Sequence, residues 1–234
     1  MIKLETHCHT YGASSCANTP NDLIVQKYLN AGYAGIVVTN HLSAHSYNNY
    51  FIGKTHKEKI DSYFGFIDGF NLECKKVGIK TFWGTEIRTV DDIEYMVIDL
   101  PKSEYYARAL FKLTQKELFE LCEKHGAFMY QTHPFRYGVC AGDPKYLHGA
   151  ESFNGHYHHV NNNDKAEQFC IDNNLIGLSG SDYHHPDQPV TAGIYIREDI
   201  FDNKDLVKYL FENKFELIKE EQTYLEELKK YKGL

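Results

Sequence analysis

Two histidines, His7 and His9, stand one residue apart at the end of a segment that predicts a short strand over residues 2–10. Alternate residues of a strand point to the same face, so both imidazoles project together while Cys8 points away. Two imidazoles supply half of a four-ligand site for a first-row transition metal. The alternative is a chance pairing in a chain with 13 histidines.

Further metal-ligand residue types follow other predicted strands. Apolar runs cover residues 35–41, 78–88, 127–134 and 175–184, and near their ends stand His41, Glu86, His133, Asp182 and His184. Strands buried on both faces have little other use for such residues, because an unpaired buried charge is costly. Mixed imidazole and carboxylate ligands suit Zn²⁺, Mn²⁺ or Fe²⁺ and argue against a thiolate-rich structural zinc. The sequence therefore predicts a metal site built from several strand ends.

The elements that must position these residues alternate between strand and helix. Helices are predicted over residues 23–31, 57–76 and 161–173, from a capping box at 114–117 to Gly126, and from about Asn203 and Lys219 onward; further strands are predicted over 93–100, 150–154 and 192–196. Residues 42–56 are expected to form a polar loop, and Thr19 is expected to cap the first helix. Such alternation builds α/β barrels, in which the strands' C-terminal ends form the active site.

Five short motifs occur in a distinctive order. They are Glu-x-His-x-His at 5–9, Thr-Asn-His at 39–41, Gly-Thr-Glu at 84–86, His-Pro at 133–134 and Gly-Ser-Asp-Tyr-His at 180–184. Together they resemble the PHP family, named for polymerase and histidinol phosphatase. The resemblance implies a distorted seven-stranded (β/α) TIM-like barrel, which at 234 residues fits one domain over residues 1–234. It also implies a metal-dependent phosphoesterase with two or three divalent ions at the C-terminal face of the barrel.

The resemblance assigns a ligand set residue by residue. His7, His9, Glu86 and Asp182 look like ligands of a first ion; Glu86 would bridge to a second ion with His133; His41 and His184 look like ligands of a third. Two positions depart from the family pattern. Ser14-Ser15-Cys16 stands where many members have a histidine, and Glu94 stands where many have another, so Glu94 could supply an oxygen ligand instead. Asn40 also replaces a common aspartate beside His41.

Several residues outside this set carry open alternatives. Arg88 and Arg136 directly follow ligand motifs and suit phosphate binding, but each could equally be a surface arginine paired with a neighbouring loop. Cys16 is close enough in sequence to reach a metal, although a small turn residue is the favoured interpretation. The tract at 156–159 could form a lid or a metal-binding tract, and a plain exposed loop is the favoured interpretation.

Composition limits the partners. The net charge of −7 argues against nucleic acid as a main partner, except as a short substrate. No apolar run approaches the ~20 residues that a membrane helix needs, and Met1 leads directly into the first strand, so we expect a cytoplasmic protein without membrane contact. The six cysteines form no Cys-x-x-Cys pair, which argues against a disulfide framework. The sequence does not determine the oligomeric state.

The functional hypothesis is a metal-dependent hydrolase that cleaves a small phosphomonoester, as histidinol phosphatase does, with Glu86, Asp182, Arg88 and Arg136 as catalytic residues. A metal-bound hydroxide would attack phosphorus, and the ions would neutralise the phosphoryl oxygens. The alternatives are a phosphodiesterase or exonuclease acting on nucleotides or short oligonucleotides, a metal-dependent amidohydrolase, and a degenerate barrel that binds metal without turnover.

Overall fold

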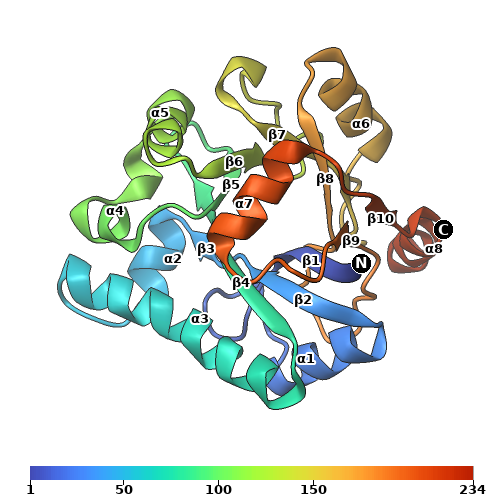
Figure 1. The fold of residues 1–234 in the computed structure, drawn as a ribbon, viewed down its shortest axis with the longest axis horizontal. Coiled ribbons are helices and arrows are strands. Elements are labelled where there is room, and N and C mark those ends of the chain that lie inside the picture. Colours follow the sequence, from blue (N-terminus) through green and yellow to red (C-terminus); the bar gives the residue numbers. More distant parts are fainter. Residues whose placement is uncertain (234) are drawn as a thin grey trace.

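Strands of this protein wind into a barrel that is nearly closed (Figure 1). The computed structural model describes residues 1–233. The hydrogen-bonded order is β10-β9-β1-β2-β4-β5-β6-β7-β8, and β3 pairs with β4 beside this path. The strands are β1 (Ile2–Cys8), β2 (Tyr33–Val38), β3 (His41–Leu42), β4 (Lys80–Arg88), β5 (Glu94–Ile98), β6 (Phe128–Gln131), β7 (Gly149–Asn154), β8 (Ile176–Gly180), β9 (Ala192–Ile196) and β10 (Leu217–Lys219).

The barrel closes where the segment after β8 returns to β1. The backbone N–H of Tyr183 donates to the carbonyl of His7 at 3.2 Å, and the N–H of His9 donates to the carbonyl of Tyr183 at 3.1 Å. This contact brings the last predicted ligand motif against the first one. The predicted α/β barrel is thereby confirmed, and the first motif, at 5–9, lies beside the last, at 180–184.

The barrel mixes parallel and antiparallel pairs. β1 with β2, β2 with β4, β6 with β7 and β7 with β8 are parallel. β5 is antiparallel to both of its neighbours, because only five residues join it to β4 and a parallel crossover needs a dozen or more. β9 and β10 extend the sheet beyond β1 as antiparallel strands.

Helices surround the strands (Figure 1). They are α1 (Asn21–Asn30), α2 (Ala44–Asn49), α3 (His56–Val77), α4 (Lys102–Ala107), α5 (Gln115–His125), α6 (Asn163–Asp172), α7 (Asn203–Glu212) and α8 (Glu221–Lys232), with short 3₁₀ turns at Leu110–Lys112 and Pro144–Tyr146. The predicted capping box of α5 is confirmed, since Thr114 and Glu117 bond reciprocally. Among the described residues, no helix combines the length and apolarity needed to cross a bilayer.

Two local predictions were wrong. Residues 42–56 are not only a loop. They contain the last residue of β3 and the whole of α2, and a reciprocal capping box between Ser43 and Ser46 begins α2. Thr19 does not cap α1, which begins without a side-chain cap. The Thr19 hydroxyl donates instead to the carbonyl of His184 at 3.2 Å. A tertiary hydrogen bond therefore replaces the helix cap that the local pattern predicted.

The barrel interior is apolar at one end only. Helix α7 crosses the barrel in Figure 1, and its Leu206 and Leu210 belong to the same buried cluster as Leu4, Val37 and Phe82 from the strands. Leu4 and Phe82 lie in the N-terminal halves of β1 and β4, so α7 covers that end of the barrel. The opposite end, where the parallel strands finish, is left for polar side chains.

Candidate metal centre

Four predicted ligands converge at the C-terminal end of the barrel. His7 Nε2 lies 2.9 Å from His9 Nε2, and Asp182 Oδ1 lies 3.3 Å from each of these nitrogens. Glu86, at the end of β4, places Oε1 3.4 Å from His7 Nε2 and Oε2 3.5 Å from His9 Nε2. Ligands at about 2.0–2.1 Å from a tetrahedral ion stand about 3.3–3.4 Å apart. The spacing of this group therefore fits one transition-metal ion.

Glu86 also belongs to neighbouring groups. Its Oε1 lies 3.2 Å from His133 Nε2, and its Oε2 lies 2.7 Å from His41 Nδ1. Glu94 reaches both histidines, with an oxygen 3.6 Å from His133 Nε2 and another 3.6 Å from His41 Nδ1. The structure thus places Glu94 where the resemblance calls for an imidazole, with an oxygen facing each neighbouring group.

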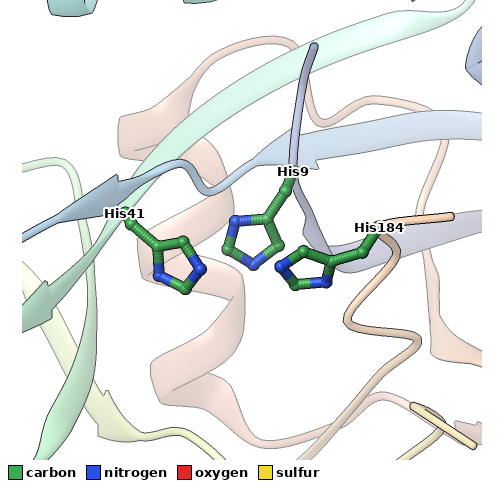
Figure 2. A group of neighbouring side chains, drawn as sticks. All are labelled: His9, His41 and His184. Carbon is green, nitrogen blue, oxygen red and sulfur yellow. The ribbon is translucent and has the colours of Figure 1, made fainter. Parts of the chain in front are cut away.

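Three imidazoles, those of His9, His41 and His184, meet beside this centre, and Figure 2 shows them pointing toward one another. The ring of His9 lies 4.3 Å from that of His41 and 4.0 Å from that of His184, centroid to centroid. Cys16 joins this group: burial would raise the pKa of its thiol, but hydrogen bonds with His184 and His41 outweigh burial and lower the pKa to about 5. Cys16 therefore lies beside this group, and its role as a metal ligand or as a small turn residue stays a prediction.

The residues present fit divalent cations. Glu86 Oε2, His9 Nδ1 and His133 Nδ1 are buried without a hydrogen-bond partner, which is rare for buried polar atoms. Burial, with the neighbouring His184 and His41, lowers the pKa of His9, so its ring is neutral and keeps a lone pair. Burial would raise the pKa of Glu86, but His7 and His41 outweigh it and keep the carboxylate ionised. Neutral imidazoles and ionised carboxylates are the forms that bind Zn²⁺ and Mn²⁺.

Glu151 is a site residue that the sequence analysis missed. It is fully buried on β7, and its Oε1 accepts a hydrogen bond from His7 Nδ1 at 2.7 Å. That bond fixes the tautomer that leaves His7 Nε2 free to face Glu86 and Asp182. Its Oε2 accepts from the backbone N–H of His133 at 2.8 Å. The available signal was an acid within the predicted strand 150–154, where burial of an unpaired charge would be costly.

Glu5 fixes the backbone of two segments that carry predicted ligands. Its Oε1 accepts from the backbone N–H groups of His7 at 2.8 Å and Ser181 at 2.9 Å, and its Oε2 accepts from the Tyr28 hydroxyl at 2.8 Å. Burial raises the pKa of Glu5 to about 7 despite these bonds. Glu5 therefore ties the end of β1 to the segment that carries Asp182.

The two predicted phosphate-binding arginines are paired with carboxylates. Arg136 donates to Asp182 Oδ2 and, at 2.9 Å each, to the side-chain oxygens of Asn154 and Asn161. Arg88 donates to Glu94 at 3.0 and 3.2 Å and to Asp92 at 3.0 Å. Arg136 thus holds Asp182 in place, whereas the half-exposed Arg88 still borders open space.

That space is a pocket of about 650 Å³ beside the centre. Its lining includes Ser14, Ser15, Cys16, His41, Ser43, Ala44, His45, Ser46, Arg88, Thr89, Val90, Asp92, Glu94, Phe111 and Lys112. His41 and Glu94 therefore face the predicted ligands on one side and the pocket on the other. A molecule in this pocket would reach the centre directly.

The prediction of a plain exposed loop at 156–159 was wrong. His156 and Tyr157 are 4 % and 5 % exposed, although His159 is exposed. Tyr224 of α8 covers the segment: its hydroxyl donates to the His159 carbonyl at 2.9 Å and accepts from the N–H of Asn161 at 3.1 Å. Coverage by a distant helix is invisible in the local sequence.

We expect Glu151→Gln to weaken metal binding by about 10–100-fold, the usual effect of removing a partner that orients a ligand. The amide keeps the shape but removes the charge that selects the His7 tautomer. Equilibrium dialysis against Zn²⁺ at several free concentrations measures this affinity. Glu123→Gln is the matched control, because Glu123 pairs with His148 Nε2 at 2.8 Å away from the centre. Equal affinities of Glu151→Gln and wild type would contradict the orienting role.

Comparison with known proteins shows the same fold. No protein-family model matches the sequence, and no curated protein matches it significantly. A two-domain protein from Bacteroides vulgatus, described as containing a predicted PHP-like metal-dependent phosphoesterase, superposes with a TM-score of 0.68 at 19% identity, over 98% of this chain and 69% of that one. PsfC from Pseudomonas syringae gives a TM-score of 0.67 at 15% identity, over 98% and 97% of the two chains.

A lesion-specific endonuclease Q from Pyrococcus furiosus also shares the fold, with a TM-score of 0.62 at 12% identity. The match covers 92% of this chain and 57% of that enzyme. These identities are low, so the likeness is one of fold. The chain has the nearly closed barrel seen in PHP-like phosphoesterases. At the end of the barrel where the parallel strands finish, it has buried clusters of histidine and glutamate with the spacing of metal ligands.

Proposed function

We propose that this protein is a metal-dependent phosphoesterase that hydrolyses a small phosphomonoester, with His7, His9, His41, Glu86, Glu94, His133, Asp182 and His184 as ligands of two to three divalent ions. The observation that carries the proposal is that His41 and Glu94 belong both to the ligand clusters and to the wall of the adjacent pocket. When bound, the ions would supply positive charge for the phosphoryl oxygens and lower the pKa of an attacking water.

The residues of the chain would prepare the reaction in defined ways. Glu151 holds His7, and Arg136 holds Asp182, so two ligands are fixed by partners that lie beyond the ions. The low exposure of His7, His9, Glu86 and Asp182 excludes bulk water from the ligand atoms. A dry, rigid set of donors strengthens electrostatic stabilisation of charge that develops during reaction.

The pocket supports a small substrate with a phosphate and an apolar part. Arg88 and Lys112 place cationic groups on its wall, and Ala44, Val90 and Phe111 supply apolar surface. A volume of about 650 Å³ lies in the range of small-molecule sites. Together with the net charge of −7, this favours a small phosphomonoester over a nucleic-acid strand. The six free cysteines support the expected cytoplasmic location, which is a reducing compartment.

The test compares a phosphomonoester with a phosphodiester as substrates of the Mn²⁺-loaded protein. We expect turnover of the monoester to exceed that of the diester, and no turnover of either after chelation. Preferred cleavage of the diester would favour the phosphodiesterase alternative, and preferred cleavage of an amide would favour the amidohydrolase alternative. A metal-loaded protein that cleaves none of a broad panel would identify a non-catalytic metal-binding barrel.

Substrate binding in the pocket predicts a role for Lys112. Lys112→Met should raise KM for a phosphomonoester by about 10–150-fold, because a hydrogen bond to a charged group contributes about 1.5–3 kcal/mol, while kcat should change less. Lys116→Met is the matched control, since Lys116 is an exposed lysine of α5 whose contact is with Glu120 at 3.7 Å. Steady-state kinetics measures both constants. Equal KM values for the two variants would place the substrate elsewhere.

A further inference from the structure

Three histidines outside the predicted ligand set meet at the rim of the barrel. They are His156 and His158 from the segment after β7 and His185 from the segment after β8, and one ring nitrogen of each lies within 4.8 Å of the others. The ring centroids of His158 and His185 lie 4.8 Å apart, and that of His156 lies 5.2 Å from His158 and 5.8 Å from His185. Three imidazole nitrogens are a sufficient protein donor set for one Zn²⁺.

We propose that His156, His158 and His185 form a second, separate Zn²⁺ site that joins the two rim segments. We refer to it as the rim site. It shares no ligand with the central clusters, although the ring of His156 lies 5.2 Å from that of His184. An all-imidazole set suits Zn²⁺, whereas Mn²⁺ and Mg²⁺ prefer oxygen ligands. The rim site and the carboxylate-rich centre should therefore differ in which ion they retain.

The backbone around the rim site is held in place without metal. Gly155 N–H donates to the Gly180 carbonyl at 2.9 Å, and a Cβ at Gly155 would lie 2.2 Å from Thr191 Oγ1, so only glycine permits this close approach. Asn161 donates to the His156 carbonyl at 3.1 Å. On the other segment, the N–H of Gln188 donates to the carbonyl of His185 at 3.1 Å. An ion would meet an arrangement that is already ordered.

The partners of the individual rings leave nitrogen lone pairs for an ion. His185 Nδ1 lies 3.4 Å from the Asn18 side-chain oxygen, and donation to that oxygen leaves His185 Nε2 with a lone pair. His156 Nδ1 accepts a long hydrogen bond of 3.3 Å from the backbone N–H of His158, and breaking this weak bond costs little free energy. Tyr231 stacks on His158 with 4.1 Å between centroids and 18° between planes, and stacking occupies the ring face, not the nitrogens in its edge.

Packing alone is the competing explanation, since stacked histidine and tyrosine rings also bury surface. The two explanations differ in the Zn²⁺ content that they predict. A bound ion would use one nitrogen of each ring, so replacing one ring should remove the ion. Packing alone would leave the Zn²⁺ content independent of these residues.

The experiment measures Zn²⁺ per chain by elemental analysis after equilibrium dialysis at fixed free Zn²⁺. We expect His158→Gln and His185→Gln each to hold one Zn²⁺ fewer than wild type. Both positions are only partly buried, so the variants should fold, and circular dichroism checks this. His159→Gln is the matched control: this exposed histidine lies in the same tract but outside the group of three nitrogens. It should retain the wild-type count.

A second arm separates the rim site from the central one. In a Glu86→Gln background, where we expect two central positions to lose metal, His158→Gln should still remove one Zn²⁺ per chain. Dialysis against Mn²⁺ alone should leave the rim site empty. Equal Zn²⁺ content of wild type and both rim variants would overturn the proposal, as would an equal loss in His159→Gln.

Discussion

Glu86→Gln should release metal from two positions together and reduce turnover by at least about 10–100-fold, the cost of losing even an indirect partner of a metal ligand. The two carboxylate oxygens face different groups: Oε1 is 3.2 Å from His133 Nε2, and Oε2 is 2.7 Å from His41 Nδ1. A glutamine keeps one oxygen but replaces the other with an NH₂ group, which cannot bind a cation. One substitution therefore removes a ligand from two groups.

The competing role for Glu86, an ion pair with Arg88, is contradicted by the structure. Arg88 donates to Glu94 and Asp92, and Glu86 is 1 % exposed among histidines. Glu104→Gln is a matched control, because Glu104 is also a buried carboxylate that bonds a histidine, His125 Nε2 at 2.9 Å, and it is not part of the pocket lining. Metal content per chain and phosphatase rate decide the question. Unchanged stoichiometry with substantial activity in Glu86→Gln would rule out a bridging role.

Removing metal should abolish turnover and destabilise the protein strongly. We expect more than one transition-metal ion per chain after purification, since the eight predicted ligands exceed what a single four-coordinate ion can use. A ligand present at 100 times its dissociation constant stabilises the folded state by about 2.7 kcal/mol. In a domain of 150–250 residues, each kcal/mol shifts Tm by about 2–4 °C. One ion should therefore raise Tm by roughly 5–11 °C, and two ions by about twice that.

The physical reason is the charge left behind when the ions leave. Burial would lower the pKa of His7, but Asp182, Glu151 and Glu86 outweigh it and raise that pKa well above its usual range. In the stripped protein, a proton on His7 must therefore balance carboxylates that metal would otherwise neutralise. Differential scanning calorimetry before and after chelation, and after returning Mn²⁺ or Zn²⁺, measures the effect.

Glu86→Gln provides the control for this second prediction, because a protein that already lacks metal at two central positions should lose less Tm than wild type on chelation. If wild type and Glu86→Gln shift equally, the stabilising ions are bound elsewhere. If chelation leaves both Tm and turnover of wild type unchanged, the centre does not hold metal.

Much of the barrel and of the centre could be predicted from local sequence. Continuous apolar runs placed the strands that lead to His7, Glu86 and Asp182. A short hairpin connection explains why β5 alone departs from the parallel pattern within the barrel wall. Parallel strands of a barrel present their C-terminal ends on one face. Residues at those ends must therefore meet, whatever the details of packing, which is why the ligands could be named in advance.

The partners of those residues were decided only by the tertiary structure. His7 bonds Glu151 across 144 residues of sequence, and Arg136 bonds Asp182. His185 meets His156 and His158 where the close approach at Gly155 joins two segments. The period of a strand fixes which face a side chain takes, a property of adjacent residues. Which distant side chain lies opposite depends on strand register, barrel closure and covering helices such as α8, and none of these is encoded within a window of a few residues.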